Sequence, residues 1–467
     1  MPSTLTVMTD DAGVTDERAR QAVTLLHRMG VGASDRVVVL ADNADAVLAL
    51  TWGALRAGIV PVPLNTALSD PQMAEMAADA DARAIVIDEG NAGRLAAHLV
   101  LTDALLDGAR PSADGLAPLP QARAMHYTSG TTGSAKGVWS GLLGRDLGRA
   151  WVEDERAANP TGPDDVHLVC SYLFHSGPHR YALNTLNGGG RVVVQPRFDA
   201  GATLAAIQRE RVTTAFMVPT HLARMLDHPA MGTTDLSSLR WIHHAGAACP
   251  EPLKRRALRT FPDGVLHEFY GSTEGQFTAI SPDEWLQRPG SVGRARTGRR
   301  LLVTEGVDGP EVDPGVIGTV WVSAPPHGRF AYWRDPAKTA AAWRGDLFTV
   351  GDLGLVDREG YLTLAGRRGD LIITGGVNVY PAEVERVLLA HPAVLEGVVY
   401  GLPDPRWGQQ VTAAVIPRRG ASADPEEIRS FLRQRLAGFQ TPKHIEVVDD
   451  LPRTASGKVV RSRLTGA

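Results

Sequence analysis

Strand-length apolar runs that alternate with helical patterns most strongly limit what this chain can fold into. Residues 36–40, 58–64 and 84–88 are short, mostly apolar runs, and residues 16–29 and 46–57 carry apolar side chains at helical spacing. This alternation is typical of a mainly parallel sheet with helices on both of its faces. We therefore predict such a sheet at the start of the chain.

The same alternation returns in the middle of the chain. Strand-like runs at 167–172, 191–194 and 214–219 are combined with a helical stretch at 202–210. From about residue 290 to 365 the helical patterns become rare, and short strands are separated by Gly, Pro and Asp turns. We expect further parallel sheet followed by a smaller β-rich subdomain.

The pattern changes again near residue 367. Pro381 stands at the first position of one predicted helix, and Asp424 precedes another as its N-cap. A chain of 467 residues is also too long for one ordinary core. The predicted fold class is α/β, with a large N-terminal domain (residues 1–367) of doubly covered, mainly parallel sheets plus a β-rich subdomain. A small α+β C-terminal domain (residues 368–467) follows.

Composition excludes several classes of protein. The net charge of -4 lacks the basic excess of a nucleic-acid binder. The apolar runs are far shorter than the roughly 20 residues that span a bilayer, and residues 1–15 hold no apolar signal core. The two cysteines, Cys170 and Cys249, are too few for a disulfide framework. We expect a cytoplasmic protein.

Residues 126–138 form a loop rich in glycine, serine and threonine. Its glycines let backbone N–H groups turn inward, its hydroxyls add donors, and Lys136 supplies a mobile positive charge, which together suit a polyphosphate. It departs from the G-x-x-x-x-G-K-[ST] pattern, because Ala135 precedes the lysine and Gly137 follows it. A loop of this composition also suits a flexible surface turn. The predicted phosphate-binding residues are Thr128, Ser129, Gly130, Thr131, Thr132, Gly133 and Lys136.

This loop resembles the signature loop of the adenylate-forming superfamily, which includes acyl- and aryl-CoA ligases, peptide-synthetase adenylation domains and luciferases. The family usually has proline where this chain has Ala135, so some rigidity is lost but no donor. The match is collinear over nearly the whole chain. Its other motifs are Tyr270-Gly271-Ser272-Thr273-Glu274, Gly351-Asp352, Gly366-Arg367 and Ser456-Gly457-Lys458.

The resemblance implies an ATP site with Mg²⁺. Glu274 is expected to hold the metal ion, and Thr273 is expected to contact the α-phosphate. Both residues are expected to be catalytic. Asp352 and Arg367 are expected to bind the ribose. Alone, a Gly-Ser-Thr-Glu sequence more often caps the start of a helix. The remaining residues expected around the adenine and the metal are Gly246, Ala247, Tyr270, Gly271 and Ser272.

The resemblance also implies two half-reactions with a mobile C-terminal domain. Lys458 is expected to enter the site for adenylate formation, where a cation between two anionic reactants stabilises the developing charge. Gly369 would be the hinge between the steps, and glycine suits a hinge because it reaches backbone conformations that other residues avoid. Gly375 and Gly376 would line a thiol tunnel, or simply turn the chain. His175 would be an aromatic gate between the acyl and thiol sites.

The acyl pocket is expected to include Ser176, His179, Gly246 and Gly271. No Asp stands where adenylation domains pair with an α-ammonium group, which argues against an amino acid as the substrate. His179 or Arg180 could recognise a second polar group on the acid, but the surface is the more common place for both. Aryl, short acyl and fatty acids therefore all remain open.

The leading hypothesis is an acid–CoA ligase that uses ATP, Mg²⁺ and CoA on a small-molecule acid, as a monomer or homodimer. An alternative keeps adenylation and changes the acceptor or the acid: a carrier protein, an amine, or nitrite in a diazotase of a natural-product pathway. A third reading is a binding protein that has lost catalysis. The joint presence of Lys136, Glu274, Asp352 and Lys458 argues against the third.

Overall fold

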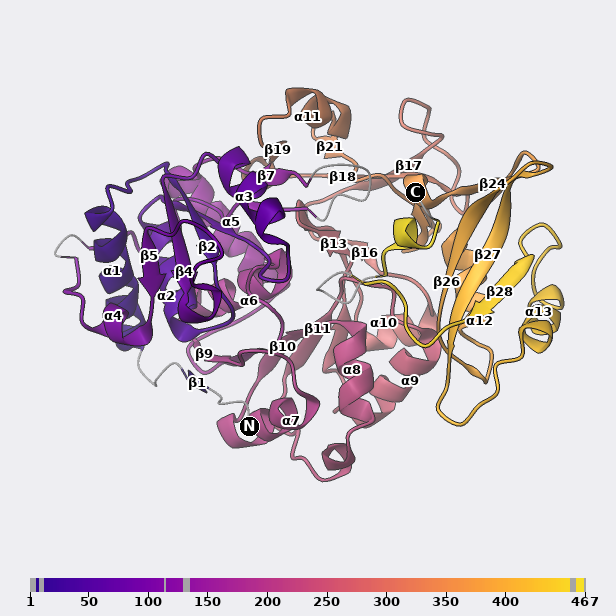
Figure 1. Ribbon diagram of the computed structural model, residues 1–467, viewed down its shortest axis with the longest axis horizontal. Coiled ribbons are helices and arrows are strands. Elements are labelled where there is room, and N and C mark those ends of the chain that lie inside the picture. The colour runs from indigo at the N-terminus through magenta and orange to yellow at the C-terminus, as the bar shows by residue number, and fades with distance from the viewer. Residues whose placement is uncertain (1–5, 8–11, 113–114, 129–134, 454–458, 466–467) are drawn as a thin grey trace.

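The computed structural model describes residues 6–7, 12–112, 115–128, 135–453 and 459–465 (Figure 1). Its first sheet has the strand order β3-β2-β4-β5 and is parallel throughout. Every residue of α2 is buried, because this helix packs beside α1 within the core. The elements are α1 (Ala12–Arg28), β2 (Arg36–Leu40), α2 (Asp45–Arg56), β3 (Val60–Pro63), α3 (Asp70–Asp79), β4 (Ala84–Asp88), η1 (Glu89–Asn91), β5 (Leu99–Leu101) and α4 (Asp103–Asp107).

A second sheet has the order β1-β9-β8-β10-β11-β12, and only the edge strand β1 runs antiparallel. Helix α6 contacts β8, β9 and β10 and also contributes to the core of the first sheet, so it lies between the two. The elements are β1 (Thr6–Val7), α5 (Gly144–Ala158), β8 (Val166–Val169), α6 (Ser176–Asn187), β9 (Arg191–Val194), α7 (Ala200–Glu210), β10 (Thr214–Met217), α8 (Pro219–Leu226), η2 (Pro229–Gly232), β11 (Trp241–His244), α9 (Glu251–Thr260) and β12 (Leu266–Glu268).

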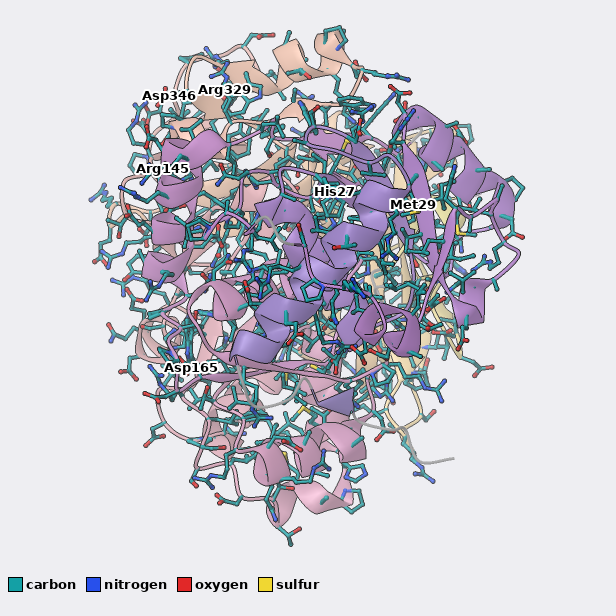
Figure 2. The ribbon with its side chains drawn as sticks, turned by 90° about the vertical axis from the view of Figure 1, so that its left-hand side faces the viewer. His27, Met29, Arg145, Asp165, Arg329 and Asp346 are labelled. Carbon is teal, nitrogen blue, oxygen red and sulfur yellow. The ribbon has the colours of Figure 1, made fainter. Side chains whose placement is uncertain are left out.

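These two sheets confirm the predicted covered, mainly parallel architecture. Figure 2 shows α1 running across one side of the molecule, with His27 and Met29 near its C-terminal end. In sheets of this kind ligands bind outside the carboxyl ends of the strands. The segments that follow β11 and β12 are the ones that carry Gly246 and Tyr270.

The predicted β-rich subdomain is an antiparallel sheet, β20-β21-β18-β22-β23, with β17 paired to β18. Residues 271–276 form the hairpin β13–β14, so the reading of this segment as a helix start is wrong. The elements are β13 (Gly271–Ser272), β14 (Gly275–Gln276), β15 (Thr278–Ala279), α10 (Pro282–Gln287), β16 (Arg294–Ala295), β17 (Leu301–Thr304), β18 (Gly318–Ser323), η3 (Pro326–Gly328), α11 (Pro336–Ala342), β20 (Trp343–Arg344), β21 (Leu347–Phe348), β22 (Asp352–Val356) and β23 (Leu362–Arg367).

The last part of the chain is an α+β unit around the long hairpin β26–β27. Pro381 opens α12, and the Asp424 carboxylate accepts the backbone N–H of Glu426 at 2.9 Å, as an N-cap should. No helix in the described ranges combines the length and apolar character needed to cross a bilayer. The elements are η4 (Arg368–Asp370), β24 (Ile372–Thr374), β25 (Val377–Val379), α12 (Pro381–Leu388), β26 (Val394–Asp404), β27 (Gly408–Pro417), α13 (Pro425–Arg433), β28 (His444–Val447) and η5 (Arg461–Arg463).

Candidate active site

The glycine-rich loop is held at its base by a small sheet. Strands β6 (His126–Tyr127) and β7 (Gly137–Trp139) pair on either side of it, and β7 pairs in turn with β19 (Ala331–Tyr332). The backbone N–H of Thr128 donates to the carbonyl of Lys136 at 2.9 Å. The base of the loop is therefore tied to a segment that lies almost 200 residues further along the chain.

Lys136 has an acidic partner at the base of the loop. Its Nζ lies 3.7 Å from Oδ2 of Asp335, and both side chains are about one-quarter exposed. An ammonium group that is accessible and only loosely paired can transfer to an anion that carries more charge. Lys136 therefore suits the predicted contact with phosphate. The predictions for Ser129, Gly130, Thr131, Thr132 and Gly133 lie outside the described residues.

Asp352 is the centre of a second cluster. It accepts hydrogen bonds from the Tyr270 hydroxyl and, at 3.1 Å, from Nε of Arg367, its partner across β22 and β23. Burial raises the pKa of Asp352 above its usual value, while Arg367 and Tyr270 act in the opposite direction. Burial also raises the pKa of Tyr270, so its hydroxyl stays a donor. The structure thus brings together three predicted nucleotide residues.

Glu274 is buried beside this cluster at the turn of the β13–β14 hairpin. The Tyr332 hydroxyl donates to its Oε1 at 2.8 Å, and the Ser272 hydroxyl donates to its Oε2 at 2.6 Å. Both carboxylate oxygens are therefore oriented and keep lone pairs for a hard cation such as Mg²⁺. The sequence analysis does not point to Tyr332, because Tyr332 and Glu274 are 58 residues apart in the chain and no local sequence pattern links β19 with the hairpin.

Gly246 and Ala247 lie directly after β11 and are exposed. Gly246 has φ of +89°, a conformation that favours glycine. Bare, accessible backbone after β11 suits the flat face of a nucleobase, and the contact of Gly246 and Ala247 with the adenine stays a prediction.

His179 is buried, and the side chain of Arg180 is only 12% exposed, so the expectation that both lie at the surface is wrong. The His179 ring packs against the ring of His126 at a centroid distance of 5.4 Å, and Arg180 points toward Glu155 on α5. Burial lowers the pKa of His179 to about 4, so this imidazole is neutral at physiological pH. His175 is the N-cap of α6 and packs its ring against Phe174 at a centroid distance of 4.6 Å.

Two adjoining cavities open between α5, α6 and the β13–β14 hairpin. The first, here called the histidine cavity, has a volume of about 30 Å³ and is lined by Ser176, His179 and Thr273 among others. The second, here called the hairpin cavity, has a volume of about 20 Å³ and is lined by Glu274 and Gln276 among others. Each cavity is narrow and has room for one or two water molecules. Of the predicted acyl-pocket residues, Gly246 and Gly271 line neither cavity.

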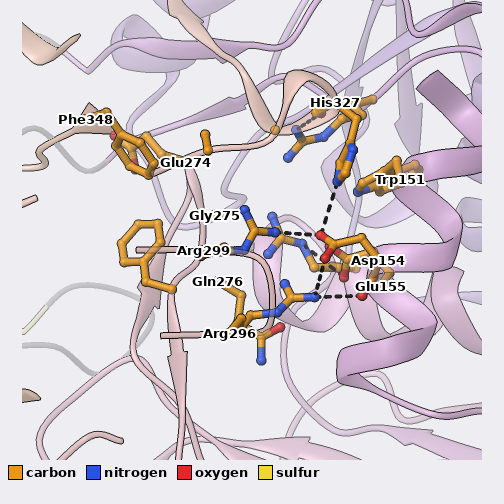
Figure 3. A pocket seen from close by; sticks show the side chains of 15 residues that line it. Trp151, Asp154, Glu155, Glu274, Gly275, Gln276, Arg296, Arg299, His327 and Phe348 are labelled. Atoms are coloured by element: carbon orange, nitrogen blue, oxygen red, sulfur yellow. Dashed lines mark hydrogen bonds and ion pairs between the residues drawn. The ribbon is translucent and has the colours of Figure 1, made fainter. Parts of the chain in front are cut away.

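Charged side chains line the hairpin cavity, and of these the sequence analysis names only Glu274 and Arg180. Figure 3 shows Asp154 on its wall, with Arg296, Arg299 and His327 around it. A side-chain nitrogen of each of these three residues lies 3.2, 2.5 and 3.3 Å, respectively, from a carboxylate oxygen of Asp154. Arg180 lies 3.9 Å from Glu155 on the same wall. These residues come from distant parts of the chain, so no local pattern reveals them.

A buried ionic network supports the strands that lead into the nucleotide cluster. Lys254 on α9 lies 3.4 Å from Glu268 at the end of β12 and also contacts His244 at the end of β11. Lys254 is 1% exposed. Burial lowers the pKa of Lys254 and raises the pKa of Glu268, and the two charges oppose these shifts in each other.

The C-terminal unit carries the remaining predicted residues. Gly369 lies in η4, directly after β23. Gly375 and Gly376, with φ of +58° and +79°, form the turn between β24 and β25, and Gly375 donates to the carbonyl of Trp407 at 2.8 Å. Lys458 lies outside the described residues.

Comparisons with known proteins show the family of this chain. The model of the AMP-binding enzyme family matches residues 13–330, and that of the AMP-binding enzyme C-terminal domain matches residues 383–458. A feruloyl-CoA synthase from an Amycolatopsis species is 36% identical, covering 94% of this chain and 90% of the relative. A fatty acid–[acyl-carrier-protein] ligase from Streptomyces coeruleorubidus is 32% identical, covering 99% of this chain and 93% of the relative.

Among solved structures, ATP-bound MatB from Rhodopseudomonas palustris is 31% identical, with a TM-score of 0.87, and the match covers 97% of this chain and 92% of that one. The TM-score is 0.75 for the same protein without ATP. The predicted resemblance and the predicted fold class are confirmed. This chain belongs to the family of AMP-binding enzymes, which form acyl-adenylates.

Proposed function

We propose that this protein is an acid–CoA ligase that activates a carboxylic acid with ATP. The single observation that carries the proposal is the Tyr270–Asp352–Arg367 cluster beside the oriented carboxylate of Glu274. A buried carboxylate fits the vicinal hydroxyls of a ribose, and a second carboxylate nearby fits a metal ion on the phosphates. The match to a CoA synthase along 94% of the chain supports a thiol acceptor.

In the first step a carboxylate oxygen of the acid attacks the α-phosphorus, and pyrophosphate leaves. We assign Thr273 to the α-phosphate, Lys136 to the outer phosphates and Lys458 to the charge that develops between the two anions. Mg²⁺ held by Glu274 would neutralise phosphate charge. In the second step the CoA sulfur attacks the acyl carbonyl, AMP leaves, and the thiol proton passes to solvent.

We also propose that the chain divides after Arg367 into a nucleotide-binding domain and a mobile lid. Arg367 ends the last strand of the antiparallel sheet, and Gly369 follows within two residues. The higher TM-score to MatB with ATP than without it supports an arrangement suited to the first step. Turning about Gly369 would then bring Gly375 and Gly376 to the thiol, with His175 between the acyl and thiol sites.

The test measures AMP and pyrophosphate release with a panel of carboxylic acids, with and without CoA. AMP release that requires both an organic acid and CoA is the expected result. AMP release that needs an acyl-carrier protein or an amine instead of CoA would replace the acceptor, and release driven by nitrite without any carboxylate would overturn the assignment to acids.

A further inference from the structure

The last residue of α3, Asp79, reaches both ends of the glycine-rich loop. Its Oδ2 accepts a hydrogen bond from the Tyr127 hydroxyl at 2.7 Å, and its backbone carbonyl accepts one from Nε1 of Trp333 at 2.8 Å. Tyr127 ends β6, directly before Thr128. Trp333 follows β19, and its backbone N–H donates at 2.8 Å to the carbonyl of Gly137, the first residue of β7. Figure 1 shows α3, β7 and β19 close together, so one residue of α3 holds both ends of the loop.

The placement of Asp79 is unfavourable for α3 itself. A carboxylate at the C-terminal end of a helix meets the negative end of the helix dipole, where a cation is preferred, and the last turn of α3 carries no basic residue. The nearby arginines pair instead with Oδ2 of Asp81, Arg36 at 3.1 Å and Arg334 at 3.0 Å. Burial and the hydrogen bond to Asp79 raise the pKa of Tyr127, so its hydroxyl stays a donor. The Asp79 carboxylate is therefore stabilised by Tyr127 rather than by its own helix.

The segment that carries Trp333 also faces Lys136. Two residues beyond Trp333, Oδ2 of Asp335 lies 3.7 Å from Nζ of Lys136. The Trp333 ring packs edge-on against the ring of Trp139 in β7, with the two centroids 5.1 Å apart. The backbone on either side of Lys136 and the carboxylate opposite its ammonium group are thus both tied to the indole that α3 binds.

We propose that Asp79 is a positioning residue for the phosphates of ATP. It holds both ends of the loop, so it sets the distance between Thr128 and Lys136. This inference rests on the proposed function, in which Lys136 binds the outer phosphates. Donors bind a polyphosphate tightly only when their own supports keep them close to the required geometry. Pyrophosphate contains the outer phosphates and an acyl-adenylate does not, so Asp79 acts on the first half-reaction and not on thiolysis.

Tyr127→Phe tests this anchor, because it removes the hydroxyl and keeps the ring. ATP–pyrophosphate exchange, run with an acid that the wild-type protein activates, gives the KM for ATP and the KM for pyrophosphate. Both should rise about 3- to 10-fold, since a hydrogen bond to a charged group is lost. The KM for the acid and the rate of thiolysis of a supplied acyl-adenylate should stay unchanged. Asp79→Asn, which keeps an acceptor oxygen without the charge, should give a smaller rise than Asp79→Ala.

Tyr361→Phe is the matched control. The Tyr361 hydroxyl donates to Oε1 of Glu284 on α10 at 2.8 Å, a hydrogen bond of the same kind outside the small sheet that holds the loop. This variant should leave all four quantities unchanged.

A KM for ATP that is unchanged in Tyr127→Phe, or that rises equally in Tyr361→Phe, overturns the role of Asp79. So does a fall in the thiolysis rate as large as the rise in the KM for ATP, because it indicates a general loss of structure. Exchange that needs no carboxylic acid overturns the proposed function instead and leaves the phosphate anchor standing.

Discussion

Replacing Lys254 with methionine tests how the buried ionic network supports the nucleotide strands. Lys254 Nζ lies 3.4 Å from Glu268 Oε2, and its side chain is 1% exposed. At an effective dielectric constant of about 20, two unit charges at that distance attract by roughly 5 kcal/mol. Removing one partner of such a pair leaves a buried charge uncompensated, so Lys254→Met should lower the free energy of unfolding by about 3–5 kcal/mol at pH 8.

The loss should depend on pH, with a sign that follows from Glu268. Burial raises the pKa of this carboxyl, and Lys254 opposes the shift, so the pKa rises further in the variant. A carboxyl group whose pKa is higher in the folded than in the unfolded state lowers the free energy of unfolding at pH values above the folded-state pKa. At pH values below the unfolded-state pKa the group is protonated in both states, so it has little effect on stability. The destabilisation should therefore be large at pH 8 and shrink as the pH approaches 4.5. His244 and Cys249 stay neutral over this range, because burial lowers the pKa of the imidazole and raises that of the thiol.

Urea unfolding followed by tryptophan fluorescence at pH 8, 6 and 5 measures this effect. The double variant Lys254→Met, Glu268→Gln removes both charges and should recover most of the loss, while Lys443→Met, at an exposed lysine, serves as the surface control. A loss below about 1 kcal/mol at pH 8 would refute the reasoning, since that is the size of an exposed pair. So would an equal loss at all three pH values.

Three further variants address the nucleotide site. Asp352→Asn should raise the KM for ATP by roughly 10- to 100-fold, because two hydrogen bonds to a charged acceptor become weaker; an unchanged KM in pyrophosphate exchange would argue against ribose binding. Tyr332→Phe removes the donor to Glu274 and should lower kcat by about tenfold, with a higher Mg²⁺ requirement in the AMP-release assay; a normal Mg²⁺ titration would contradict this. Lys458→Ala should abolish adenylate formation while thiolysis of a supplied acyl-adenylate survives; equal loss of both steps would contradict the two-state assignment.

The sequence predicts well those features that are encoded locally. The cap at Asp424 and the start of α12 at Pro381 depend on residues within one helical turn, and both are found in place. The apolar runs also predict the buried strands of the parallel sheets, because a strand that is covered on both faces has few polar residues. The resemblance names Asp352 and Arg367 each as a ribose contact, but it does not show that the two side chains pair across β22 and β23.

What the sequence does not predict depends on contacts between distant segments. The hydrogen bond from Tyr332 to Glu274 spans 58 residues, and the arginines around the two cavities lie on segments from 123 to 299. His179 and Arg180 were expected at the surface because such side chains usually lie there. The packing of α6 between two sheets reverses this, and helical periodicity alone cannot show what a helix packs against.

The three-stranded sheet at the base of the glycine-rich loop limits how the protein can be cut. Strand β19 completes this sheet, and its Tyr332 also orients Glu274. A fragment that ended before Ala331 would leave Val138 and Trp139 as an open edge and Glu274 without one of its donors. The two pieces of a split enzyme should therefore regain activity only when mixed, and a break placed after β23 should be tolerated far better than one placed before β19.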